Sequence, residues 1–110
     1  MIFTEAKNSL GVYRDENYRL VQCCGGHIVF SYARKGNGMA IHFASDKKGL
    51  RLVKRSINSF CEWIFNHYKW CEVIFAAIRK ERESIIRIVL KCGFVYLADD
   101  SKHHIYARYK

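Results

Sequence analysis

The sequence predicts an α/β domain built on one mixed sheet. Short segments rich in β-branched and aromatic residues fill positions 18–44, an apolar period of 3.6 residues begins at Val53, and a nearly all-apolar segment follows that helix. When the spacing of apolar residues changes from a period of 2 to a period of 3.6 residues and back, strands and helices are expected to alternate. The expected order is β-β-β-α-β-α-β-β, an antiparallel meander followed by a parallel crossover.

The composition is typical of one folded domain. The chain has 110 residues, of which half are apolar and 15% are aromatic, and this argues against disorder. No apolar run approaches the roughly 20 residues that a membrane-spanning helix needs, and the N-terminus lacks the pattern of a secretory signal. We therefore expect a single domain over residues 1–110, with 1–17 poorly patterned, in a cytoplasmic protein without a membrane partner.

The first half of the chain predicts three strands. They cover Tyr18–Cys24, His27–Ala33 and Met39–Ala44, which are rich in β-formers. Gly25-Gly26 separates the first two strands, and Lys35-Gly36-Asn37-Gly38 makes a tight turn between the second and third, because Gly and Asn tolerate positive φ. These segments indicate an antiparallel meander.

A long amphipathic helix follows the meander. Its expected buried face repeats at helical spacing and consists of Val53, Ile57, Phe60, Cys61, Ile64, Phe65 and Tyr68. Cys71–Ile78 is nearly all apolar, as expected of a strand buried on both faces. A strand, a helix and a further strand form a crossover whose two strands are parallel.

A second helix and a hairpin complete the prediction. The apolar face of this helix consists of Ile85, Ile88, Val89 and Cys92. Gly93 is placed to end the helix in the left-handed conformation. Phe94–Ala98 and His103–Tyr109 are the last two strands.

Five cysteines occur in the chain: Cys23, Cys24, Cys61, Cys71 and Cys92. Their odd number and apolar surroundings favour buried thiols over disulfides. A zinc site from Cys23, Cys24, His27 and a distant His103 or His104 matches no known ligand spacing, so no metal is predicted.

Positive charge is the strongest signal of the composition, with a formal net charge of +9. Five basic residues surround the start of the first helix: Lys47, Lys48, Arg51, Lys54 and Arg55. Such a cluster fits a phosphate site for a coenzyme, a contact with a nucleic-acid backbone, or a solvated helix face.

Two segments resemble the GNAT acetyltransferase family, and the resemblance covers roughly Met39 to Lys110. The first is a strand and loop in which Lys48-Gly49 stands where the family has Arg-Gly. The second is Arg82–Phe94, which is similar to the family's Asn-x-x-Ser-x-Arg-x-x-x-x-x-Gly-Phe segment and ends in Lys-Cys-Gly-Phe. In its size and short N-terminal part the chain also looks like the small GNAT-like proteins of bacteriophages.

The resemblance implies an acetyl-CoA-dependent N-acetyltransferase that acts on an amine of a small molecule or protein. The loop and the helix start would hold the pyrophosphate, since free N–H groups and the helix dipole favour anions there, and the strand backbone would pair with the pantetheine arm. The cofactor-binding residues that it implies are Phe43, Ala44, Ser45, Lys48, Gly49, Leu50, Arg51, Leu52, Val53 and Arg82. Transfer would be direct, so no cysteine nucleophile is required.

Several residues depart from the family pattern. Arg51 and Val53 replace small residues, and their side chains are expected to obstruct the approach of pyrophosphate, although Arg51 could instead bind a phosphate. Arg82 replaces the Asn, Ile85 the Ser, and Val89 the frequent tyrosine acid. These departures favour an alternative: a catalytically degenerate, viral GNAT-fold protein that binds a host, virion or nucleic-acid partner.

His42 is the candidate catalytic base. It lies on the strand that leads into the loop, and an imidazole titrates near neutrality. The competing interpretation is a partly buried strand histidine without a role in catalysis. Whether the chain is an enzyme is left open by these residues.

Overall fold

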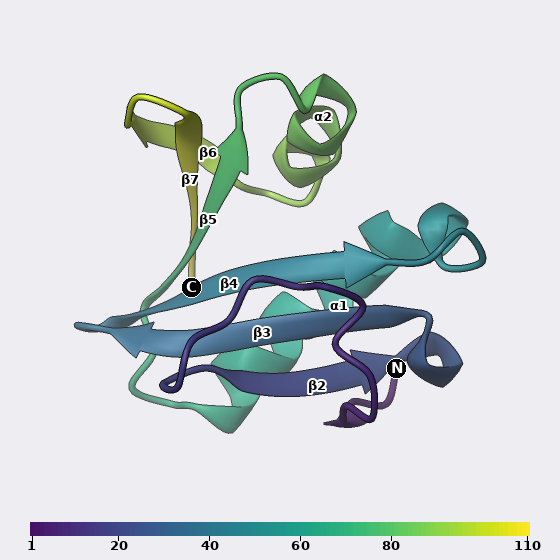
Figure 1. The fold of residues 1–110 in the computed structure, drawn as a ribbon. Coiled ribbons are helices and arrows are strands. Elements are labelled where there is room, and N and C mark those ends of the chain that lie inside the picture. The colour runs from purple at the N-terminus through teal and green to yellow at the C-terminus, as the bar shows by residue number, and fades with distance from the viewer.

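The computed structural model describes residues 1–110 and contains one seven-stranded sheet in the order β1-β2-β3-β4-β5-β7-β6 (Figure 1). The strands are β1 Thr4–Glu5, β2 Arg19–Cys23, β3 Ile28–Lys35, β4 Gly38–Ser45, β5 Val73–Arg79, β6 Val95–Asp99 and β7 His103–Tyr109. The helices are α1 Val53–His67 and α2 Glu83–Lys91, with short 3₁₀ turns η1 at Cys24–Gly26 and η2 at Leu50–Leu52. No helix is long and apolar enough to cross a membrane.

The predicted order of elements is confirmed after residue 18 but lacks the first strand. The antiparallel meander β2-β3-β4 and the parallel pairing of β4 with β5 are both present. The expected order was incomplete because β1 pairs with β2 through only two residues, Thr4 and Glu5. A strand this short has no periodicity that a sequence pattern can reveal.

Both helices pack on one face of the sheet. Alternate residues of β3, beginning with Ile28 and Phe30, join the α1 side chains in the main core. The rings of Phe30 and Phe60 stack with centroids 4.1 Å apart, and both side chains are fully buried. The predicted buried face of α1 is confirmed, with Phe65 and Tyr68 only partly buried at its edge.

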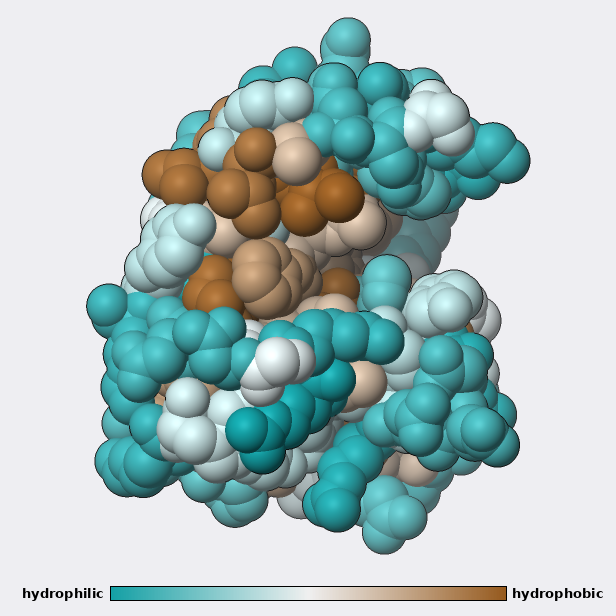
Figure 2. All heavy atoms as spheres, turned by 90° about the vertical axis from the view of Figure 1, so that its left-hand side faces the viewer, coloured by the Kyte–Doolittle hydropathy of each residue, from teal (hydrophilic) through white to brown (hydrophobic).

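No helix covers the opposite face of the sheet. The loop at residues 6–18 crosses β3 and β4 there (Figure 1), and the Ser31 hydroxyl donates a hydrogen bond to the Tyr13 carbonyl over 2.5 Å. The loop stops short of β5, so Ala77 is exposed. The expectation that β5 is buried on both faces is therefore wrong for its second half. Figure 2 shows a patch of apolar surface in the upper half of the molecule. Val95 and Leu97 of β6 are among the exposed large apolar side chains.

Candidate functional site

The parallel strands β4 and β5 separate halfway along their length. Their register runs from Gly38 opposite Val73 to Ile41 opposite Ala76, and no pair follows. Beyond this point β4 remains paired only with β3, while β5 remains paired only with β7. Figure 1 shows the two strands diverging from their paired ends.

This separation leaves two strand edges without partners. The β5-facing edge of His42–Ser45 and the β4-facing edge of Ala77–Arg79 carry backbone N–H and C=O groups that no ladder satisfies. Backbone polar groups require partners. At this opening between the two backbones, the free edge of β4 can accept an extended ligand as an additional strand.

The loop after β4 is held by the carboxylate of Asp46. One oxygen of this carboxylate lies 2.5 Å from Nδ1 of His27, and the other accepts the N–H of Gly49 over 3.0 Å. The hydrogen bond with His27 lowers the pKa of Asp46 below its ordinary value, and the N–H of Gly49 acts in the same direction. Asp46 is therefore ionised at neutral pH and fixes both ends of the loop.

Gly49 allows the loop to lie directly on the start of β3. A Cβ atom at this position would come within 2.6 Å of the His27 carbonyl oxygen and 2.8 Å of a side-chain carbon of Ile28. The backbone φ of Gly49 is −83°, so a glycine is needed for space and not for conformation. Gly49 of the Lys48-Gly49 pair therefore lets the loop pack closely against the chain at the start of β3.

The loop leads through η2 into the first turn of α1. No side chain caps either helix. The N–H of Val53 donates to the Leu50 carbonyl, and the N–H of Leu52 donates to the Gly49 carbonyl over 2.9 Å. The positive end of the α1 dipole therefore faces this loop without a side-chain acceptor to offset it.

Free cations surround this helix start. The five basic residues that the sequence singled out are all exposed, and none takes part in an ion pair: Lys47, Lys48, Arg51, Lys54 and Arg55. A depression of about 580 Å³ is lined by His27, Lys47, Lys48, Leu50, Arg51 and Leu52. Since the neighbouring Asp46 is engaged with His27, this depression is suited to an anion.

Val53 does not obstruct this surface. Its side chain is only 2% exposed and belongs to the main core. The expectation of obstruction is therefore wrong for Val53, because the first turn of α1 directs this side chain towards the sheet. Arg51, in contrast, is exposed and lines the depression.

The remaining predicted cofactor residues lie on both sides of the opening. Phe43 is partly buried against the core, and Ala44 and Ser45 are partly exposed at the end of β4. Arg82 occupies the N-cap position of α2 beyond β5 and is exposed. No hydrogen bond or ion pair joins Arg82 to the loop at residues 46–49.

His42 is the first residue of β4 beyond the last pair with β5. The ring of Tyr13 lies 4.7 Å from its ring, and that of Tyr18 lies 5.6 Å away, centroid to centroid. Burial lowers the pKa of His42 below its ordinary value of 6.5, and the nearby His103 lowers it further. His42 is therefore neutral at pH 7 and able to accept a proton. Sequence reasoning missed the two tyrosines, because residues 6–18 carry no regular pattern.

Val89, which the resemblance is expected to align with a tyrosine acid, offers no proton donor. Val89 is 1% exposed and packs in the core. The cysteines are free thiols, as predicted, and burial raises the pKa of Cys61 to about 12. Val89 has no ionisable group, and the Cys61 thiol stays protonated at neutral pH.

Comparisons with known proteins identify the fold. No family model and no curated protein matches the sequence. Among solved structures, the ribosomal-protein-S5-alanine acetyltransferase of Vibrio fischeri aligns with 84% of this chain and 62% of its own, at 17% identity and a TM-score of 0.68. The N-acetyltransferase PseH of Campylobacter jejuni in complex with acetyl coenzyme A aligns with 87% of this chain and 70% of its own, at 10% identity and a TM-score of 0.73.

A GNAT-family acetyltransferase of Bacillus anthracis aligns with 84% of this chain and 66% of its own, at 14% identity and a TM-score of 0.66. The chain thus spans less than two thirds of the V. fischeri enzyme and somewhat more of PseH. These likenesses show that the chain has the GNAT-like α/β fold, and the predicted fold is confirmed at this level.

Proposed function

We propose that the chain is an acetyl-CoA-dependent N-acetyltransferase. The observation that carries the proposal is the unpaired β4 edge at His42–Ser45, which leads directly into a cationic loop and an uncapped helix start. A long, thin ligand with amide groups at one end and phosphates at the other fits this sequence of features. Acetyl-CoA has this form.

The chain's residues fit the cofactor at both ends. Backbone groups of Phe43, Ala44 and Ser45 would pair with the pantetheine amides, as an added strand does. The diphosphate would lie at the loop from Lys48 to Leu52, where backbone N–H groups, the helix dipole and unpaired cations favour anions. Val53 would contribute only by fixing the first turn of α1, since its N–H donates to the Leu50 carbonyl and its side chain is buried. Arg82 would contribute through its charge from the β5 side.

Acetyl-CoA, when bound, supplies an acyl group activated as a thioester. The chain's own contribution would begin at His42, whose neutral imidazole can take the proton of an acceptor ammonium group before the amine attacks. Tyr13 and Tyr18 lie against the ring of His42 and restrict its orientation. After the attack the nitrogen loses a second proton, and since Val89 offers no acid, that proton would reach the leaving thiolate directly or through solvent.

The acceptor would be an amine of a small molecule or a protein. The V. fischeri neighbour is described as acting on an alanine of a ribosomal protein, and other neighbours are described as spermidine N-acetyltransferases. No helix covers the sheet face that carries His42, only the loop at residues 6–18, and both classes of amine remain candidates. A bacteriophage-like origin stays a prediction from size alone.

Calorimetry and a thiol-release assay test the proposal. Titration of the protein with acetyl-CoA at low salt should give saturable binding at millimolar concentration or below. With a panel of amines, release of the CoA thiol should exceed the rate without protein. An absence of binding at millimolar acetyl-CoA would refute the proposal.

The alternative is a GNAT-fold binding protein without catalysis. The burial of Val89 at the acid position favours it. It predicts that no amine causes release of the thiol from acetyl-CoA. If the cationic loop instead contacts nucleic acid, the logarithm of that affinity should fall linearly with the logarithm of salt concentration, and acetyl-CoA should not compete.

A further inference from the structure

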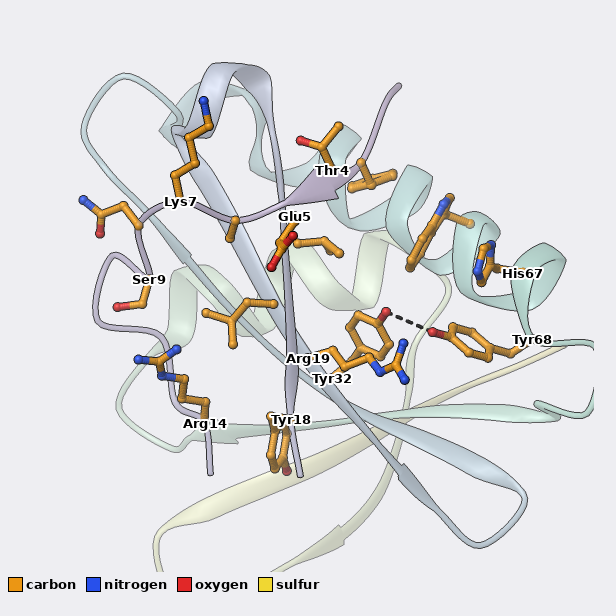
Figure 3. Close-up of a pocket in the computed structure, with 16 residues that line it drawn as sticks. Thr4, Glu5, Lys7, Ser9, Arg14, Tyr18, Arg19, Tyr32, His67 and Tyr68 are labelled. Carbon is orange, nitrogen blue, oxygen red and sulfur yellow. Dashed lines mark hydrogen bonds between the residues drawn. The ribbon is translucent and has the colours of Figure 1, made fainter. Parts of the chain in front are cut away.

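A second cavity lies at the other edge of the sheet, away from the opening between β4 and β5. Its volume is about 670 Å³, and it is bounded by the N-terminal segment, the start of β2 and the C-terminal part of α1 (Figure 3). The β1–β2 ladder covers only Thr4 and Glu5, and beyond the bond from the Ala6 N–H to the Leu20 carbonyl the segment no longer pairs with the β2 backbone. The departing loop forms one wall, and Tyr32, Trp63 and Tyr68 line the opposite side.

Hydrogen-bond donors predominate in this cavity. Lys7, Arg14 and Arg19 line it, and none of their charged groups takes part in an ion pair or hydrogen bond. The hydroxyls of Tyr32 and Tyr68 lie 3.0 Å apart. One of these two hydroxyls donates to the other, so the accepting hydroxyl keeps its own proton for a ligand.

The wall around these donors is aromatic. Tyr68 meets Tyr32 edge to face at 5.9 Å and Trp63 at 6.3 Å between ring centroids. Figure 3 shows Arg19 beside the joined hydroxyls of Tyr32 and Tyr68. The cavity therefore combines a flat apolar surface with a guanidinium and a phenolic donor at one end.

Glu5 is the single acidic residue in the lining, and it has no ion-pair partner either. With three cations and one carboxylate in its lining, the cavity carries a net positive charge. An anion would gain from the three cations and would be weakened by Glu5.

We propose that this cavity is a binding site for a small organic anion, with an aromatic or flat apolar body and one carboxylate or phosphate group. Arg19 and the free phenolic proton of the Tyr32–Tyr68 pair would hold the anionic group, because a guanidinium offers several donors in one plane. Trp63 and Tyr68 would contact the body of the ligand. Strands β2 and β3 separate this site from the β4 opening, so the inference does not depend on acetyl-CoA binding.

Fluorescence of Trp63 provides a direct test. The only other tryptophan, Trp70, lies outside the cavity beneath Arg34, and a Trp70→Phe variant makes Trp63 the sole reporter. Four probes share one ring and differ in charge: benzoate, phenyl phosphate, benzyl alcohol and benzylammonium. Benzoate, phenyl phosphate or both should bind saturably, about tenfold or more tightly than the alcohol, given the strength of charge-assisted hydrogen bonds. Comparison of the two anions decides between a carboxylate and a phosphate ligand.

Three substitutions in this background test the assignment of roles. Arg19→Gln should weaken binding of the preferred anion about fivefold or more, since it removes a charged donor. Tyr68→Phe should weaken it about threefold, because the Tyr32 hydroxyl that remains belongs to a buried side chain and Tyr68 is the less buried of the two. Glu5→Gln should tighten it about threefold, because a repelling charge is lost. Arg87→Gln is the matched control: Arg87 is exposed on α2, and its loss should leave the affinity within twofold.

The proposal is overturned if the alcohol binds as well as the anions, or if Glu5→Gln weakens binding. It is also overturned if Arg19→Gln has no more effect than Arg87→Gln. A Lys48→Gln/Arg51→Gln variant separates the two sites. It should lose acetyl-CoA binding and retain anion binding at Trp63, whereas loss of the anion signal in this variant would place the anion at the loop and contradict the proposal.

Discussion

Nδ1 of His27 lies 2.5 Å from the carboxylate of Asp46 and joins the start of β3 to the loop that follows β4. The same carboxylate accepts the N–H of Gly49. One side chain thus fixes a loop that is surrounded by cations and contains few other side-chain contacts.

The Asp46→Asn variant tests whether Asp46 affects acetyl-CoA binding through the geometry of the loop or only through its negative charge. Removing a negative charge beside the cationic loop would by itself strengthen the binding of an anionic cofactor. Because Asp46 positions the loop, we expect acetyl-CoA to bind about three- to tenfold more weakly, the scale of one or two lost hydrogen bonds. Calorimetry measures this, with Glu62→Gln on the exposed side of α1 as the charge-matched control. Tighter binding in Asp46→Asn would contradict the role of the loop.

Gly49→Ala should destabilise the fold through crowding. The added Cβ would lie 2.5 Å from the Ser45 hydroxyl and 2.6 Å from the His27 carbonyl. We expect a loss of about 1–3 kcal/mol in the free energy of unfolding, as for other overpacked sites. Gly36→Ala is the comparison: it has open space around it and a φ of +62°, so it should cost only about 1 kcal/mol of backbone strain. Urea denaturation compares the two, and a smaller loss at Gly49 would argue against a closely packed loop.

The pH dependence of the reaction should follow the protonation of His42. Its pKa is lowered by burial and by His103, so the neutral base persists below pH 6.5. The acid limb of kcat/KM should therefore have a midpoint below 6.5 and should disappear in His42→Gln, with kcat reduced about 100-fold or more. An unchanged acid limb in His42→Gln would exclude this residue as the base.

The lowered pKa of His42 also makes the free energy of unfolding depend on pH. A histidine with a lowered pKa in the folded state takes up protons preferentially in the unfolded state below pH 6.5. Its stabilising contribution is complete above pH 6.5 and is lost as the pH falls towards the folded-state pKa. The free energy of unfolding of His42→Gln should consequently fall less between pH 7 and pH 5 than that of the parent protein. Chemical denaturation at several pH values measures this difference, and parallel curves would contradict it.

Much of the fold could be predicted because its signals are local. The helical period from Val53 and the turn at Gly36-Asn37 act over a few residues, and both are confirmed. The order of strand, loop, helix and strand in the sequence also predicts that the five cations lie at a helix start, and they do.

The rest depends on contacts between distant residues. β1 is only two residues long, and the position of Tyr13 against His42 is set by an irregular loop. The burial of Val53 depends on the angle at which η2 enters α1, and the exposure of Ala77 depends on where the loop at residues 6–18 stops. Spacing patterns in the sequence do not predict these features.

The central claim is that the edge of β4 beyond Ile41, together with the loop after it, binds acetyl-CoA. The most direct test is a titration of ¹⁵N-labelled protein with acetyl-CoA, followed residue by residue through its amide resonances. We predict saturable shifts at His42–Ser45 and Lys48–Val53, with the amides of β2 little affected. An absence of saturable shifts at millimolar acetyl-CoA, or shifts that omit His42–Ser45, would contradict the account.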